Sequence, residues 1–183
     1  MTYADYYKAK HEGALVYQDF VVHQVLKLLG IPLIVWGSAR WQIHKGEGPI
    51  AEIKHDEFFK KTRRLWIEVR EKAEPRPGPY AVSGIYRQDE SFLWIQGDYD
   101  RIFVFFKIEL RGLHQGGAYA VIENNTETSE GFRIPEKDAM KLAMKILDPK
   151  QGKVMENVIG DLTQLGKALH ELVKRDPRQL KLL

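Results

Sequence analysis

The 183-residue chain contains no cysteine, which excludes disulfide bonds and thiolate chemistry and is typical of cytosolic proteins. It also lacks any apolar run close to the roughly 20 residues that a membrane helix needs. The first residues, Met1–Asp5, have neither the basic segment nor the apolar segment of a signal peptide. From these absences we expect a cytoplasmic protein with no membrane partner.

Several familiar catalytic patterns are also missing. The sequence has no glycine-rich phosphate loop, no metal-binding cysteine and histidine cluster, and no Gly-x-Ser-x-Gly elbow. Its net charge of +3 is too small to indicate a polyanionic partner, so only the distribution of charge is informative. The length and ordinary composition predict a single domain over residues 1–183.

What the chain does have is two charged segments, residues 47–56 and 65–72, in which apolar and polar residues alternate as in half-buried strands. If these strands pair as a hairpin, their charged side chains gather on one face, where like charges destabilise a sheet unless they are neutralised. Interleaved lysine and arginine, or a divalent cation, would neutralise them. The charged faces consist of Glu52, Lys54 and Asp56 on the first strand and of Trp66, Glu68, Arg70 and Lys72 on the second.

The tripeptide Glu52-Ile53-Lys54 resembles the (D/E)-x-K motif of the PD-(D/E)XK nuclease superfamily, which includes many restriction enzymes and phage nucleases. The longer E-x-K-x-D strand, followed by a turn and an I-E strand, resembles a phage and mobile-element branch of that superfamily. That branch usually has Thr-Gly-Asn in the turn, where this chain has Thr62-Arg63-Arg64. Further blocks that resemble the branch are Ser83-Gly84-Ile85, Gln96-Gly97-Asp98-Tyr99 and Thr128–Pro135.

The resemblance covers residues 12–147 and implies a restriction-endonuclease-like α/β core, a central mixed β-sheet flanked by helices, with a C-terminal helical extension over about 150–183. It implies a hydrolase, a DNA endonuclease that depends on Mg²⁺ or Mn²⁺. The catalytic residues would be Glu52, Lys54, Asp56 and Glu68, and the metal ligands would be Glu47, Glu52, Asp56 and Glu68.

Two features of the motif leave alternatives open. No aspartate lies between Asp19 and Glu52, so the usual upstream metal ligand is missing and Glu47 is the acid nearest to that place. A second register pairs Asp56 with Glu68-Val69-Arg70 and puts Arg70 or Lys72 at the catalytic lysine position. We prefer the register of Glu52 and Lys54, because an arginine does not deprotonate and therefore cannot serve as a base.

Basic residues near the motif are candidates for contact with DNA phosphates. Two other functions remain: a nucleic-acid-binding protein on the same fold that has lost cleavage, and an assembly or interaction protein whose charged strands form surface salt bridges. A homodimer is a further possibility. The candidate DNA-binding residues are Arg40, Lys45, Lys60, Lys61, Arg63 and Arg64.

Periodicity also predicts the other elements. We expect helices over residues 3–29, 108–113, 135–147 and 154–174, and strands over 33–36, 92–95, 101–106 and 116–123. The apolar stripe expected on the first helix consists of Leu15, Val22, Val25, Leu26 and Leu29. On its other face Glu12, Asp19 and His23 would be either solvated or, in a nuclease, a source of one acid for the site.

Overall fold

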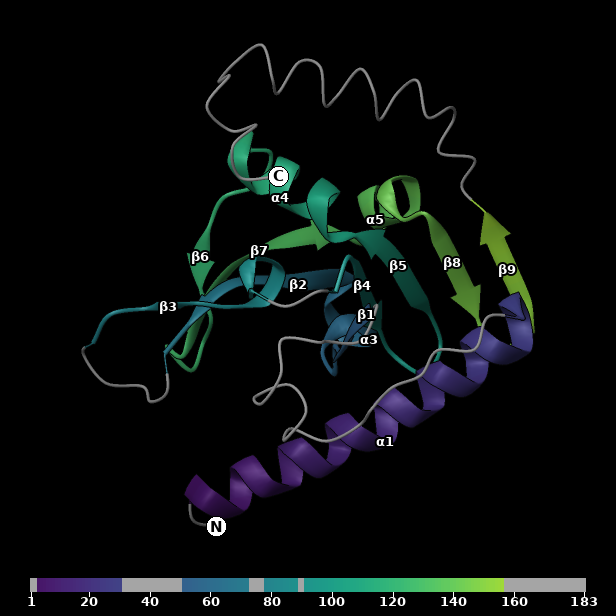
Figure 1. Ribbon diagram of the computed structural model, residues 1–183, viewed down its shortest axis with the longest axis horizontal. Coiled ribbons are helices and arrows are strands. Elements are labelled where there is room, and N and C mark those ends of the chain that lie inside the picture. The colour runs from purple at the N-terminus through teal and green to yellow at the C-terminus, as the bar shows by residue number, and fades with distance from the viewer. Residues whose placement is uncertain (1–2, 31–50, 73–77, 89–90, 157–183) are drawn as a thin grey trace.

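A computed structural model describes residues 3–30, 51–72, 78–88 and 91–156, arranged as two β-sheets with helices packed on them (Figure 1). The protein is an α/β protein, as the sequence predicts. The candidate residues Arg40, Lys45 and Glu47, the strand expected at 33–36 and most of the last expected helix lie outside the described residues.

The first sheet has five strands in the order β1-β4-β5-β8-β9 and is mixed. Strand β1 runs parallel to β4, whereas the remaining neighbours are antiparallel. The central strands β4 and β5 are almost wholly buried, as their continuous apolar runs predict. The five strands are β1 (Ala51–His55), β4 (Leu93–Gly97), β5 (Ile102–Phe106), β8 (Lys145–Asp148) and β9 (Lys153–Glu156).

The second sheet has four antiparallel strands in the order β3-β2-β7-β6. Its long central pair, β2 and β7, shifts register between Glu68 and Arg70, which marks a β-bulge in β2. The four strands are β2 (Arg64–Glu71), β3 (Ala81–Val82), β6 (Ile122–Glu123) and β7 (Ser129–Pro135).

The predicted hairpin of the two charged segments is wrong, because β1 and β2 belong to different sheets. Between them lies the four-residue helix α3 (Phe59–Thr62), which ends at Arg63 in the left-handed conformation (φ 53°). This helix and its cap redirect the chain out of the first sheet. Strand β1 then pairs with β4, so that Glu52 is the neighbour of Trp94 rather than of a residue in β2.

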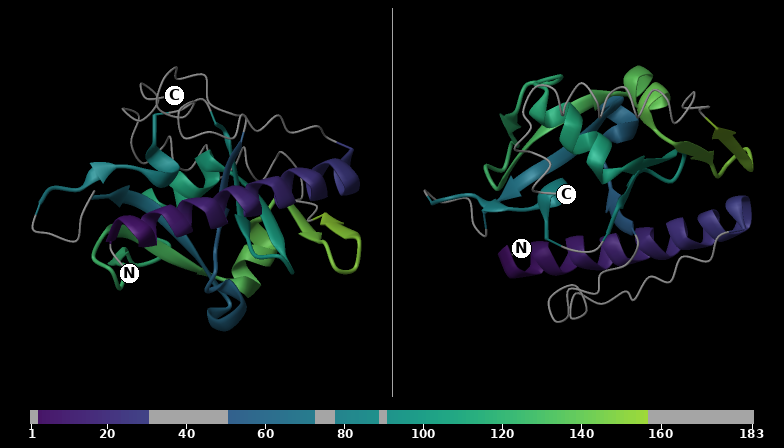
Figure 2. Two further views of the ribbon diagram at one scale, coloured as in Figure 1. Left: turned by 90° about the horizontal axis from the view of Figure 1, so that it is seen from below. Right: turned by 45° about the horizontal axis from the view of Figure 1, so that its top comes forward.

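Helix α1 (Tyr3–Leu29) crosses one side of the molecule, and α4 (Lys107–Gln115) and α5 (Glu136–Leu142) lie on the opposite side (Figures 1 and 2). The buried stripe of α1 consists of Tyr17, Val21 and Val25, at four-residue spacing. The predicted helix is confirmed, but its predicted stripe is only partly right, because Leu26 is exposed.

The residues Glu12, Asp19 and His23 of α1 are exposed. Helix α1 packs against the face of the first sheet that carries Ile53 and Ile95, and Glu52 points to the other face by the alternation of strand side chains. The described contacts therefore favour a solvated face on α1 over a contribution to the site.

Two of the expected C-terminal helices differ from the structure. The helix expected over 135–147 ends at Leu142, and the apolar pair Ile146 and Leu147 instead belongs to strand β8. Residues 153–156 form β9, which pairs with β8, where a helix was expected to begin. No helix in the described part of the chain is long and apolar enough to span a membrane.

Candidate active site at the edge of the mixed sheet

The carboxylate of Glu52 lies between two lysine side chains. Lys54 Nζ is 3.0 Å from Glu52 Oε1, and Lys107 Nζ is 2.8 Å from Glu52 Oε2. The Glu52 side chain is 8% exposed and that of Lys107 only 2%, whereas Lys54 is 33% exposed. One carboxylate is thus held by a buried ammonium group on one oxygen and by a partly accessible one on the other.

This arrangement follows from the positions of three elements. Glu52 and Lys54 share a face of β1, because side chains two residues apart in a strand point the same way. Lys107 follows β5 directly and begins α4, where its backbone N–H donates to the Phe92 carbonyl over 2.8 Å. The indole of Trp94 lies 5.6 Å from Lys54 Nζ and 6.0 Å from Lys107 Nζ, within cation–π range of both.

Buried charges of this kind are costly, because neither group keeps its hydration. Lysine is among the residue types least often fully buried. Neither Glu52 oxygen receives a hydrogen bond of good geometry from the described residues, and its partners among them are the two lysine ammonium groups. Buried charge clusters with specific partners are enriched at functional sites, which singles out this one.

Glu68 is held beside this cluster by the Ser83-Gly84 turn. Ser83 Oγ donates to Glu68 Oε1 over 2.9 Å, and Arg87 Nη2 donates to Ser83 Oγ over 3.2 Å. Arg87 also pairs with Glu71 at 3.2 Å. At Gly84 the backbone has φ +55°, and a Cβ there would lie 2.0 Å from the Glu68 carbonyl oxygen. Only glycine therefore allows this turn to lie directly on the strand that carries Glu68.

The electrostatics at Lys54 connect the two sheets. Burial acts to lower the pKa of Lys54, but the Glu52 carboxylate and then the Glu68 carboxylate outweigh burial, and the pKa is raised. The Arg87 guanidinium opposes them. Lys54 on β1 is therefore under the influence of Glu68 on β2 and of Arg87 after the Ser83-Gly84 turn, as well as of Glu52 beside it.

The described contacts of Asp56 connect the two sheets rather than the candidate site. Its Oδ2 accepts hydrogen bonds from the Trp66 backbone N–H and from Gln96 Nε2, each over 2.9 Å. Burial raises the pKa of Asp56, and these two donors oppose that rise. Gln96 also donates to the Trp66 carbonyl over 2.8 Å, so that Asp56 and Gln96 together tie the first sheet to β2. Asp56 shares a face with Glu52 and Lys54, but its described partners join the sheets.

Four acids were predicted to bind the metal, and the structure brings only part of that set together. Glu47 lies outside the described residues, and among the residues described no group of three or more acidic or histidine side chains could hold a metal ion. Mg²⁺, however, commonly uses only one or two protein carboxylates together with water and phosphate oxygens. Glu52, whose oxygens accept no hydrogen bond of good geometry from the described residues, could supply one such carboxylate, and Glu68, the other acid that acts on Lys54, is the candidate for a second.

The second register finds less support. Arg70 pairs with Glu130 on β7, and its guanidinium lies 5.3 Å from the Tyr80 ring. Lys72 pairs with Glu123 on β6 at 3.2 Å. Both cations are therefore engaged within the four-stranded sheet, whereas Lys54 contacts the candidate carboxylate directly.

The candidate DNA-binding residues of α3 and its flanks lie past the far end of β1. From Glu52 to His55, where β1 ends, the strand advances about 10 Å, and α3 follows after that. Lys60 pairs with Asp100 at 3.4 Å and Arg63 pairs with Glu136 at 2.5 Å, whereas Lys61 and Arg64 are exposed. These four residues therefore do not surround Glu52, and two of them are already neutralised.

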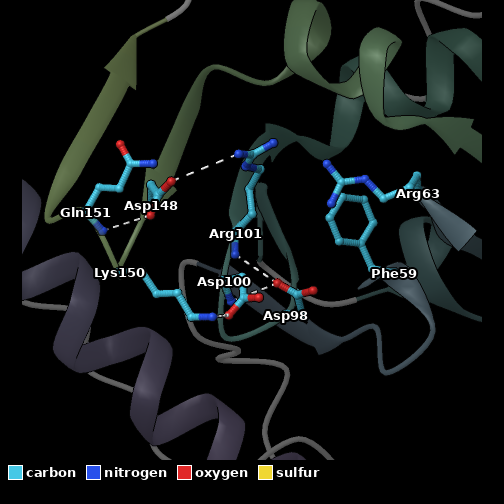
Figure 3. A pocket seen from close by; sticks show the side chains of 8 residues that line it. All are labelled: Phe59, Arg63, Asp98, Asp100, Arg101, Asp148, Lys150 and Gln151. Atoms are coloured by element: carbon cyan, nitrogen blue, oxygen red, sulfur yellow. Dashed lines mark hydrogen bonds and ion pairs between the residues drawn. The ribbon is translucent and has the colours of Figure 1, made fainter. Parts of the chain in front are cut away.

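A second charged region lies at this far end. It is a surface pocket of about 220 Å³ formed by the β4–β5 turn, the end of β8 with the residues after it, and α3 with its C-cap (Figure 3). Its acids are engaged by cations or backbone N–H groups, among them Lys150 on Asp100 at 2.7 Å and the Gln151 N–H on Asp148 at 2.9 Å. It is lined by Phe59, Arg63, Asp98, Asp100, Arg101, Asp148, Lys150 and Gln151.

Sequence reasoning missed Lys107 and Arg87. Lys107 ends a strongly apolar run, and nothing in that pattern indicates that its ammonium group turns back to Glu52. The Ser83-Gly84-Ile85 block was the signal that did point to the site, since it holds Glu68. Comparison with protein-family models, with curated proteins and with solved structures found no match for this chain.

Proposed function

We propose that the protein is a metal-dependent phosphodiesterase that cleaves DNA internally, with Glu52, Lys54 and Glu68 at its centre. The observation that carries the proposal is the buried Glu52 carboxylate, clamped by two lysines, one of which reaches solvent. A fold stabilised only by packing gains little from such a cluster, because apolar side chains of similar volume usually stabilise as well or better. A role in function would explain why the protein keeps this buried charge cluster.

The roles of the side chains follow from their positions. Lys54 is the accessible cation and would contact the scissile phosphate, where its charge stabilises the additional negative charge of the transition state. Glu52 and Glu68 would hold Mg²⁺ or Mn²⁺, which when bound lowers the pKa of a water molecule and neutralises phosphate charge. Lys107 fixes the orientation of Glu52, and Ser83 fixes that of Glu68.

A second candidate is a nucleic-acid-binding protein on the same fold that does not cleave. The observation in its favour is that both Glu52 oxygens already have a lysine partner, which competes with any metal ion. In this candidate Lys54 and Arg87 would contact phosphates and Glu52 would only position Lys54.

Incubation of the protein with supercoiled plasmid and with branched DNA, in Mg²⁺, in Mn²⁺ and in EDTA, tests the proposal. We expect cleavage with a divalent cation, none in EDTA, and loss of cleavage in Glu52→Gln. The matched control is Asp100→Asn, which removes a paired carboxylate from the far pocket and should cleave like the wild type. Binding without cleavage under all conditions would favour the second candidate, and neither binding nor cleavage would contradict both.

A further inference from the structure

The two lysines on Glu52 differ in how freely they can leave it. The Lys107 side chain is 2% exposed, and its backbone is fixed at the start of α4 by the hydrogen bond to Phe92. The Lys54 side chain is 33% exposed and lies on β1, at the edge of the sheet among the described strands. Lys107 is therefore a permanent partner of Oε2, whereas Lys54 is an exchangeable partner of Oε1.

A divalent cation and the Lys54 ammonium group cannot occupy the same side of Oε1. Mg²⁺ binds a carboxylate oxygen at about 2.0–2.1 Å, and Lys54 Nζ now lies 3.0 Å from that oxygen. The two cations would also repel one another strongly at such a short separation in a poorly hydrated site. Metal binding at Oε1 thus requires Lys54 to move away from Glu52.

Moving Lys54 costs the ion pair unless a new anion receives the ammonium group. A nucleic-acid phosphate at the exposed side of Lys54 supplies the missing negative charge. The phosphate lowers the cost of freeing Oε1, and a metal ion on Oε1 in turn releases Lys54 for the phosphate.

We infer that Lys54 is a resident cation on Glu52 and that its transfer to a nucleic-acid phosphate couples phosphate binding to divalent-metal binding. This inference rests on the proposed function, and it adds to that function a mutual dependence of the two ligands. Coupling between binding sites is reciprocal, so each ligand strengthens the other by the same factor, commonly 5- to 150-fold, about 1–3 kcal/mol.

The test measures the affinity of the protein for Mn²⁺ from the electron paramagnetic resonance signal of free Mn²⁺. Each protein is titrated alone and with a saturating phosphorothioate DNA duplex, and the Mn²⁺ bound by the duplex itself is subtracted. For the wild type we expect weak Mn²⁺ binding that the duplex strengthens by about 10-fold or more. Lys54→Met should bind Mn²⁺ more tightly than the wild type without the duplex, and the duplex should no longer strengthen it.

The matched control is Lys150→Met, which removes an ion-paired lysine from the far pocket and should keep the coupling of the wild type. Lys54→Gln repeats the measurement with a polar side chain if Lys54→Met does not fold, as judged by circular dichroism. Equal Mn²⁺ affinity with and without duplex in a wild type that cleaves DNA would overturn the coupling and leave the proposed function intact. A wild type that binds no Mn²⁺ and cleaves no DNA would overturn the proposed function itself.

Discussion

Two charged regions lie toward opposite ends of the five-stranded sheet, and they handle charge differently. In the far pocket Asp100 pairs with two largely exposed cations, Lys150 of the pocket lining and Lys60 beside it. Around Glu52 the carboxylate and Lys107 are almost fully buried. Exposed ion pairs remain hydrated, so they contribute little to the stability of the fold. Buried charges, in contrast, depend on each other, because each is costly without its partner.

In the pocket, backbone N–H groups also donate hydrogen bonds to the acidic side chains, as they do in structural turns. Asp98 Oδ1 accepts from the N–H groups of Asp100 and Arg101, both over 2.8 Å (Figure 3). The Lys150 ammonium group lowers the pKa of Asp100 and keeps it ionised. At Glu52 no such backbone donors are found among the described residues. Asp98 and Asp148 of the pocket are as buried as Glu52, so the two regions differ in the partners of their acids. Backbone N–H groups bind the pocket acids, whereas two lysine ammonium groups bind Glu52.

The largest effect on stability should come from Lys107→Met. It leaves Glu52 buried with only Lys54 as a partner, which we expect to cost about 3 kcal/mol of unfolding free energy. Lys150→Met, its counterpart in the pocket, should change stability very little, because that lysine is exposed. Urea unfolding followed by circular dichroism measures both.

The double variant Glu52→Met with Lys107→Met sharpens this comparison. Removing both charges also removes the unpaired one, so the double variant should be more stable than Lys107→Met alone. If Lys107→Met were as harmless as Lys150→Met, the buried pair would not have the cost that we assign to it.

A smaller effect is expected from Gly84→Ala, compared with Gly152→Ala. Both glycines have positive φ, +55° and +62°, so both substitutions carry the strain of a left-handed alanine, about 1–2 kcal/mol. Only at Gly84 does the new Cβ also collide with the Glu68 carbonyl oxygen, whereas Gly152 has open space. Gly84→Ala should therefore cost clearly more in urea unfolding, and equal costs would show that the turn does not press on Glu68.

The smallest expected effect is on the pH dependence of stability, and it comes from His55, the residue after Lys54. His55 stacks on Tyr17, with ring centroids 4.3 Å apart, and burial lowers its pKa despite the opposing carboxylates of Glu57, Asp56 and Asp98. Below the ordinary pKa of 6.5 the unfolded chain then binds more protons than the folded one. Stability is therefore expected to fall as the pH decreases from 6.5 toward the lowered pKa.

His55→Phe keeps a ring against Tyr17 and removes that titration. Thermal unfolding between pH 7.5 and 5 should show a shallower loss of stability in this variant than in the wild type. Part of the loss should remain, because burial also lowers the pKa of His114. An unchanged slope would mean that His55 is not buried as described.

The sequence predicts single elements and their buried faces better than it predicts their partners. Continuous apolar runs identified β4 and β5, and helical periodicity identified α1, because burial restricts the residue types of each segment by itself. The sequence did not identify the pairing of β1 with β4. Alternation shows which side chains of a strand share a face, but not which other strand pairs with it. The apolar residues of β8 fit a helix or a strand equally well, and only pairing with β5 decides between them.

The residues of the candidate site were likewise predictable only in part. Glu52, Lys54 and Glu68 are within reach of sequence reasoning, because their spacing resembles a nuclease motif and the Ser83-Gly84 block accompanies it. We expected the acids to repel one another, but Glu52 is instead neutralised by Lys107, which comes from the start of α4. A contact between residues so far apart in the chain leaves no local pattern in the sequence.

The central claim is that Lys54 acts on the reacting phosphate, and one measurement on Lys54→Ala tests it most directly. Single-turnover cleavage of a DNA duplex in Mn²⁺ is compared with binding of the same duplex in EDTA, for Lys54→Ala, Lys150→Ala and the wild type. We predict that Lys54→Ala loses at least 100-fold in cleavage rate, because it removes a charge that stabilises the transition state. Its binding should stay within a few-fold, because many phosphate contacts share the affinity, and Lys150→Ala should match the wild type in both. Full cleavage by Lys54→Ala would contradict the claim.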